Sequence, residues 1–151
     1  MKFKTALLKP LLKSFTLVEL IIVVIIVGIL ASLGLTQYSL VVEKARLAEA
    51  KVRIGVMRNL AYEYYLNNGV MTGIQNADLG VDGNCSTSSY YKYWINPWAT
   101  GLNLAAQRCT SGGKAPNASR GYTFFMGYYP GTGQSTWDCY YDDTLTSCFG
   151  L

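Results

Sequence analysis

The residues best suited to chemistry in this chain of 151 residues are one glutamate, four cysteines and three clustered aspartates. Glu19 is the only ionisable side chain in the apolar stretch from Phe15 to Leu35. Because a carboxylate inside hydrocarbon costs about 2.5–3.5 kcal/mol, such a residue is rare and is expected to have a partner. Histidine, the common proton shuttle near neutral pH, is absent, and we predict that the chain is not an enzyme and takes no cofactor.

The apolar stretch around Glu19 is long enough to cross a membrane. As a helix that rises 1.5 Å per residue, it would be roughly 30 Å long, the thickness of the hydrocarbon core of a bilayer. Four lysines lie in residues 1–14. The positive-inside rule places that segment in the cytoplasm and the chain after about residue 40 on the other side. Without these lysines, nine basic residues balance nine acidic ones, so the formal charge of +4 does not predict a nucleic-acid partner.

A second helical segment follows the apolar stretch. Its apolar residues recur at intervals of three or four, while charged residues fall largely between them. Because no proline lies between Pro10 and Pro97, we predict one helix from Phe15 to Leu66 that ends at residues 67–69. The alternative is a cleaved secretory signal, with its cleavage site near residues 31–32. The predicted apolar face of the second segment comprises Val41, Ala45, Ala48, Val52, Val56, Leu60 and Tyr64.

The segment from Ser14 to Ile21, SFTLVELI, carries a resemblance to a known family. Over roughly residues 10–65, the chain resembles the N-terminal part of type IV pilins and of the related pseudopilins of type II secretion. In that family a membrane peptidase cuts before the phenylalanine and methylates the new amino group. The resemblance implies cleavage by a prepilin peptidase between Ser14 and Phe15, N-methylation of Phe15, and a role of Glu19 in filament assembly. Ser14 stands where the family usually has glycine, and Thr36 where it often has proline.

The residues and the resemblance together predict an α+β fold. A long N-terminal helix, half membrane-spanning and half amphipathic, would pack against a small C-terminal antiparallel sheet. Residues 1–14 would be a cytoplasmic leader, 15–40 the transmembrane and assembly helix, 41–68 its amphipathic continuation, and 69–151 a globular head stapled by disulfides.

The head is rich in Gly, Ser, Thr, Asn and Tyr, as expected of turns and short strands. The expected strands are residues 122–129, 137–141 and, with a weaker pattern, 90–95. Eleven of the twelve tyrosines lie beyond Tyr38. We interpret them as packing residues of the sheet, and the alternative is an aromatic face that binds carbohydrate or DNA.

All four cysteines lie in the predicted head. An even number of cysteines outside the cytoplasm predicts two disulfides, which four cysteines can form in three ways. We favour the sequential pairs Cys85–Cys109 and Cys139–Cys148, each of which would contribute about 2–4 kcal/mol of stability. A zinc site is not expected, because the sequence has neither a CxxC pair nor a histidine.

Asp138, Asp142 and Asp143 surround Cys139 and could supply oxygen ligands to Ca²⁺, as in some pseudopilins. Their spacing does not match an EF-hand, and a solvated acidic turn explains them more simply. We therefore predict no metal site.

Two asparagines begin sequences that match the acceptor pattern for N-glycosylation. In a chain with eight asparagines, one or two matches are expected by chance, at roughly one in eight for each asparagine. The two matches are Asn84-Cys85-Ser86 and Asn117-Ala118-Ser119.

The expected protein is a prepilin in the bacterial inner membrane. After cleavage and methylation at Phe15, its helix would polymerise with copies of the same chain, served by the prepilin peptidase and the pilus assembly machinery, into a cell-surface or periplasmic filament. Pairing of Glu19 with the N-terminal amine of a neighbour would set the axial register. The alternatives are a type II secretion pseudopilin, a minor pilin that acts as a binding module, and a membrane-anchored protein that is not cleaved at Ser14.

Overall fold

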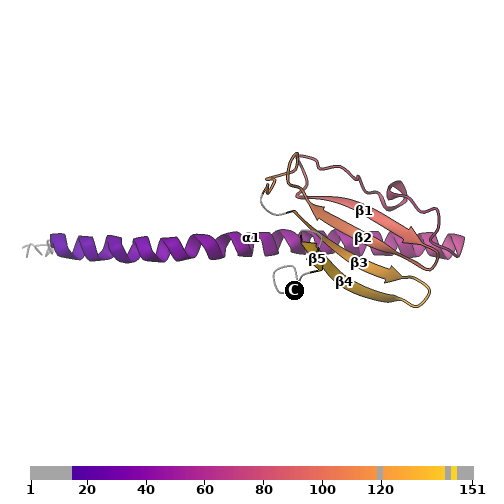
Figure 1. Ribbon diagram of the computed structural model, residues 1–151, viewed down its shortest axis with the longest axis horizontal. Helices are drawn as coiled ribbons and strands as arrows, with labels where there is room; N and C mark the ends of the chain where they lie inside the picture. Colours follow the sequence, from indigo (N-terminus) through magenta and orange to yellow (C-terminus); the bar gives the residue numbers. More distant parts are fainter. Residues whose placement is uncertain (1–14, 119–120, 142–143, 146–151) are drawn as a thin grey trace, which may run out of the picture. The chain divides into compact units, whose positions relative to one another are not determined.

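The computed structural model describes residues 15–118, 121–141 and 144–145, and its fold is the predicted α+β arrangement. One long helix precedes an antiparallel sheet (Figure 1). The chain divides into two compact units between Ser39 and Leu40, and α1 passes through both. The elements are α1 (Leu17–Asn68), a 3-10 helix η1 (Asn76–Leu79), β1 (Tyr91–Trp98), β2 (Gly101–Arg108), β3 (Tyr122–Tyr129), β4 (Gln134–Tyr141) and β5 (Thr144–Leu145).

Helix α1 begins two residues later and ends two residues later than predicted. Its last residue, Asn68, is followed by Gly69, which adopts a φ of +74°, a left-handed conformation that favours glycine. The Gly69 N–H donates to the carbonyl of Tyr65 at 2.7 Å, and the Asn68 side chain donates to the carbonyl of Tyr64 at 2.9 Å. The carbonyls of the last turn, which lack some or all of their partners within the helix, thus gain hydrogen bonds.

The sheet has the strand order β1-β2-β3-β4-β5, and every neighbouring pair is antiparallel. β3 covers the predicted strand 122–129. β1 and β4 lie at the other two predicted positions but are longer than expected. The hairpin from β1 to β2 requires glycine at position 101, because a Cβ atom there would lie 2.5 Å from the carbonyl oxygen of Tyr128.

Strand β2 was not predicted, although it lies between β1 and β3. Its sequence, GLNLAAQR, contains no β-branched or aromatic residue and has Leu, Ala, Gln and Arg, which favour helices. Six of its residues, on both faces of the sheet, are buried because neighbouring strands and side chains surround them: Gly101, Leu102, Leu104, Ala105, Ala106 and Arg108. Tertiary contacts therefore override the local preference.

The hydrophobic core lies between the sheet and the second half of α1 (Figure 1). From the helix, it receives a row of residues spaced by three and four positions: Leu47, Ala50, Ile54, Met57 and Ala61, each with 0% exposure. From the sheet, it receives alternating residues that include Leu102, Leu104, Phe124 and Met126.

The predicted apolar face of the helix was largely wrong. Val41, Val52 and Val56 are 61%, 71% and 45% exposed, and Ala45 and Ala48 are also exposed. Leu60 and Tyr64 are partly buried against the core, as expected. The helix carries two apolar rows with the same spacing of three and four, and helical periodicity does not tell which of them meets the sheet.

Candidate functional site

The N-terminus of α1 is capped by three reciprocal hydrogen bonds between Thr16 and Glu19. The backbone N–H and the hydroxyl of Thr16 donate to Oε2 of Glu19 at 2.9 and 2.7 Å. The Glu19 N–H donates to the Thr16 hydroxyl oxygen at 3.3 Å. This arrangement is a capping box, in which a threonine and a glutamate three residues later satisfy each other's backbone donors. Among the described residues, no donor bonds to the second carboxylate oxygen, Oε1.

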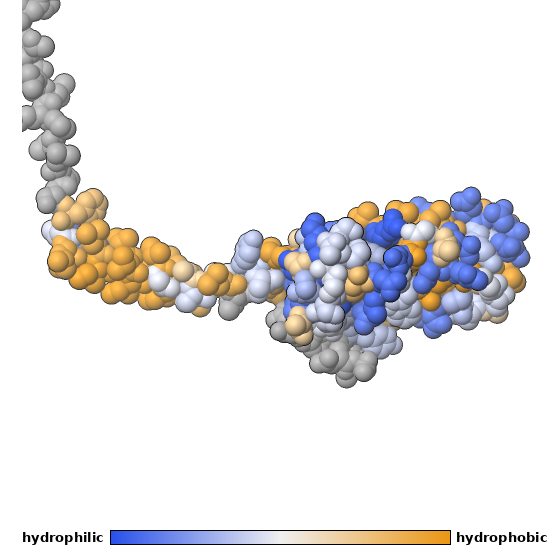
Figure 2. All heavy atoms as spheres, turned by 90° about the horizontal axis from the view of Figure 1, so that it is seen from above, coloured by the Kyte–Doolittle hydropathy of each residue, from blue (hydrophilic) through white to orange (hydrophobic). Residues whose placement is uncertain are grey.

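The N-terminal part of α1 has an apolar surface without cover. Its large hydrophobic residues from Phe15 to Leu35 are between 47% and 73% exposed. Figure 2 shows this surface as a continuous hydrophobic layer. Soluble monomers rarely expose an apolar surface of this extent. The length and composition of this helix are sufficient to cross a membrane.

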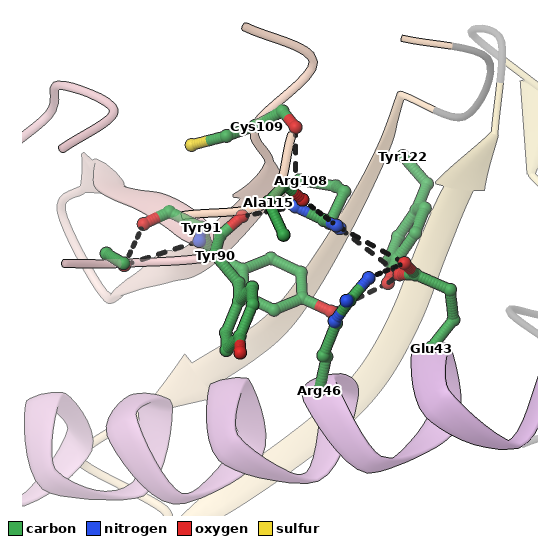
Figure 3. Close-up of polar contacts among 9 residues, drawn as sticks. Glu43, Arg46, Tyr90, Tyr91, Arg108, Cys109, Ala115 and Tyr122 are labelled. Carbon is green, nitrogen blue, oxygen red and sulfur yellow. Dashed lines mark hydrogen bonds and ion pairs between the residues drawn. The ribbon is translucent and has the colours of Figure 1, made fainter. Parts of the chain in front are cut away.

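A buried ion pair joins the second half of α1 to the sheet (Figure 3). Arg108 of β2 donates to both carboxylate oxygens of Glu43, from Nε at 3.1 Å and from Nη2 at 3.2 Å. Its other N–H groups donate to the backbone carbonyls of Tyr90, Cys109 and Ala115 at 3.0, 3.3 and 2.8 Å. All five donors of the guanidinium are therefore used, although the side chain is fully buried.

Glu43 accepts two further hydrogen bonds. Arg46, one helical turn away, donates to Oε1, and the hydroxyl of Tyr122 donates to Oε2 at 3.3 Å. The hydroxyls of Tyr91 and Tyr122 lie 2.6 Å apart. Because the Tyr122 proton points to the carboxylate, Tyr91 donates to Tyr122. A chain of hydrogen bonds thus runs from β1 through β3 to α1.

The charge state of this cluster follows from its partners. Burial raises the pKa of Glu43, but the hydrogen bonds and charges of Arg108 and Arg46 outweigh burial and hold the pKa below its ordinary value. Burial raises the pKa of Tyr122 to about 12. Glu43 is therefore an anion and Tyr122 a neutral hydrogen-bond donor at neutral pH. The charged groups of the cluster are hydrogen-bonded to one another and to the backbone. This geometry indicates a structural role, which is to hold α1 against the sheet.

A disulfide between Cys85 and Cys109 holds the segment before β1 to the end of β2. This is one of the two sequential pairs favoured from the sequence. Cys109 directly follows Arg108, and its N–H donates to the carbonyl of Tyr90 at 3.0 Å. The second favoured pair, Cys139–Cys148, stays a prediction, because Cys148 lies outside the described residues.

Comparison with known proteins finds similarity to bacterial fimbrial proteins. The chain is 37% identical to a type IV major pilin protein, PilE, of Neisseria gonorrhoeae over 84 residues, which are 56% of this chain and 50% of that protein. It is 40% identical to a fimbrial protein of Neisseria meningitidis over 85 residues, 56% of this chain and 47% of that protein. The similarity to fimbrial protein EcpC of Eikenella corrodens is lower, 29%, but covers 87% of this chain and 84% of that protein.

The chain is thus similar in sequence to type IV major pilins and fimbrial proteins. The match to EcpC extends over more of the chain than the N-terminal motif, and the structure has the long helix and antiparallel sheet that the resemblance implied. The chain spans about half the length of the two Neisseria pilins. No family model matches the chain.

The structure describes only some of the residues that the pilin resemblance marks. Phe15 and Glu19 lie at the start of α1, and both are exposed. Ser14 and the leader lie outside the described residues. The same holds for Asp142 and Asp143 of the candidate calcium cluster. Within the described part of the chain, no three His, Cys, Asp or Glu residues are grouped as metal ligands.

Sequence reasoning missed the joint between α1 and β2. Glu43 is one of the charged residues that fall between the residues of the predicted apolar face, and the sequence analysis assigns no role to Arg108. One signal was present, because Glu43 precedes Leu47 by four positions and so belongs to the same row as the buried residues Ala50 and Ile54. No local pattern indicates Arg108, whose partner lies 65 residues earlier in the chain.

Proposed function

We propose that this protein is a structural subunit of a type IV pilus, which is cleaved before Phe15, methylated there, and polymerised through the N-terminal part of α1. The observation that carries the proposal is the combination of this uncovered apolar helix with one carboxylate near its start. The names of the similar proteins, type IV major pilin and fimbrial protein, support it. The head after Leu40 would lie outside the cytoplasm.

In this proposal, the apolar surface of α1 has two successive surroundings. In the precursor, lipid covers it, because the helix is long enough to span the bilayer. In the filament, the corresponding helices of neighbouring subunits replace the lipid. Lipid and neighbouring helices both shield the apolar residues on every side of the helix from water, whose contact with them is unfavourable.

Glu19 would select the position of each new subunit. Cleavage before Phe15 creates an amino group, and the charge of a neighbour's amine complements the Glu19 carboxylate. The capping bonds use Oε2, so Oε1 is available to this second partner. In a low-dielectric surrounding, an unpaired carboxylate is strongly disfavoured, and the pairing would therefore favour one axial register over others.

The test compares two substitutions of Glu19. Glu19→Gln keeps an oxygen that can accept the capping bonds of Thr16 but removes the charge, whereas Glu19→Ala removes both. We expect both variants to be cleaved and inserted in the membrane but absent from the sheared cell-surface filaments. Incorporation of Glu19→Gln at the wild-type level would show that capping, and not pairing with an amine, is the role of Glu19.

Intact mass measurement tests processing. From the sheared fraction we expect a filament species whose polypeptide starts at Phe15, is heavier by one methyl group and is lighter by four hydrogens for two disulfides, with the mass of any attached group added. Full-length protein found only in membranes would contradict the pilin proposal. Processed protein found only in periplasmic assemblies would indicate a type II secretion pseudopilin instead.

A further inference from the structure

An open groove lies in the head between α1 and the segment that leads from η1 to β1, with a volume of about 640 Å³. That volume is within the range of about 300–1,000 Å³ that is typical of ligand sites. From the helix, Val52 and Val56 line it together with the charged residues Glu49 and Arg53, and Asp82, Asn84 and Ser86 contribute to the opposite wall. The two valines belong to the apolar row that the sheet does not cover.

One of the two glycosylation acceptor sequences borders this groove. Asn84 and Ser86, its acceptor and hydroxyl residues, both line the groove and are both exposed. They lie in a stretch without helix or strand, which is the setting that attachment of a sugar requires. The second acceptor sequence differs: Asn117 is only partly exposed, its N–H donates to the carbonyl of Cys109 at 3.0 Å, and Ser119 lies outside the described residues.

The local geometry holds the Asn84 side chain at the surface. Oδ1 of Asp82 accepts hydrogen bonds from the backbone N–H of Asn84 at 3.0 Å and from its Nδ2 at 2.9 Å. These contacts form a turn in which an aspartate side chain bonds to the backbone two residues later. The neighbouring disulfide at Cys85 fixes the segment to β2, so the position of Asn84 relative to the groove is defined.

We propose that Asn84 carries an N-linked glycan whose first sugars lie in this groove and cover Val52 and Val56. The nitrogen Nδ2 of Asn84 would attack the anomeric carbon of an oligosaccharide held on a lipid pyrophosphate. The N–C bond forms, the bond from that carbon to the phosphate oxygen breaks, the lipid pyrophosphate leaves, and a base of the transferase takes one amide proton. The apolar C–H faces of the sugars would contact the valines, and their hydroxyls would face the polar wall.

The inference rests on the proposed location of the head outside the cytoplasm, where lipid-linked oligosaccharides are transferred. The experiment uses the full chain from the envelope of the cells that produce it, reduced and digested with trypsin. Cleavage at Lys and Arg places Asn84 in the peptide 59–92 and Asn117 in the peptide 115–120, so the two sequences are scored separately. We expect a saccharide mass on the first peptide, localised to Asn84 by fragmentation.

Substitutions separate the acceptor sequence from the local structure. Asn84→Gln and Ser86→Ala should both abolish the added mass. Ser88→Ala is the matched control, because it removes the same 2.9 Å contact between the Ser86 and Ser88 hydroxyls while leaving the acceptor sequence intact. Full modification of Ser88→Ala is expected. A saccharide that persists in Asn84→Gln but disappears in Ser86→Ala is attached to the serine and overturns the proposal.

Hydroxyl-radical labelling tests the placement in the groove. Val52 and Val56 should react several-fold less in the wild-type protein than in Asn84→Gln. Val41, which is 61% exposed on the same helix but outside the groove, should react equally in both. Equal labelling of all three valines would overturn the placement. Unmodified Asn84 in exported, disulfide-bonded protein would overturn the glycan while leaving the filament proposal intact.

Discussion

Replacement of either partner of the buried Glu43–Arg108 pair should destabilise the head strongly. In Glu43→Gln, the Arg108 guanidinium keeps its charge inside the core but loses the charge that compensates it. In Arg108→Met, the carboxylate keeps Arg46 and Tyr122, but the carbonyls of Tyr90, Cys109 and Ala115 each lose a hydrogen bond from the guanidinium, and the first two keep a backbone donor. Each change leaves one buried charge of the pair without its opposite charge, which is the costly way to break an ion pair.

The size of the effect follows from burial. The side chains are 0% and 5% exposed, so water does not screen the interaction. Removal of one partner of such a pair typically costs about 3–5 kcal/mol. The double variant Glu43→Gln/Arg108→Met removes both charges of the buried pair, so it should lose less than the two single losses together. We expect the coupling free energy between the two sites to be about 2–3 kcal/mol.

Urea unfolding of the full chain in detergent, followed by tryptophan fluorescence, measures these free energies. All three tryptophans lie in β1 and β4, so the signal reports on the sheet. Glu63→Gln, an exposed position on the same helix, is the control and should change the free energy of unfolding by less than about 0.5 kcal/mol. Additive losses at Glu43 and Arg108, within about 0.5 kcal/mol, would refute the reasoning, because independent sites add.

Two further predictions follow from the same packing. The pKa of Glu43 is lowered in the folded protein, so its charge stabilises the fold above the ordinary pKa of 4.5, and this contribution is lost as the pH falls through the folded pKa. The difference in the free energy of unfolding between wild type and Glu43→Gln should therefore be constant from pH 6 to 8 and shrink below about pH 4.5. Urea unfolding at each pH measures it. A difference that grows on acidification would contradict the assignment of Glu43 as a stabilising anion. Ile54→Ala should lower the free energy of unfolding by about 2–5 kcal/mol, because Ile54 is 0% exposed. Val52→Ala, at 71% exposure, should change it by less than about 0.5 kcal/mol. Equal losses in the two variants would contradict the assignment of the row with Ile54 as the buried one.

Several features of the protein follow from the sequence alone because their causes are local. The length of the apolar run predicts a helix that can span a membrane, and its lone carboxylate predicts a partner for Glu19. The absence of proline and the residues Asn68 and Gly69 predict where α1 ends. Thr16 and Glu19 have the sequence spacing of a capping box, so the sequence also contains the signal for this cap. The aromatic residues of 122–129 predict β3, since such residues favour strands.

The tertiary structure decided the features whose causes lie far apart in the chain. Two helical rows have the same apolar spacing, and only the position of the sheet determines that the row with Ile54, and not the row with Val52, is buried. Strand β2 has helix-favouring residues and forms because β1 and β3 supply its hydrogen-bond partners on both sides. The partner of Glu43 is an arginine 65 residues away, which no local pattern identifies. Periodicity and composition describe how a segment can fold, whereas the burial of a given face and the pairing of distant charges depend on which other segments pack against it.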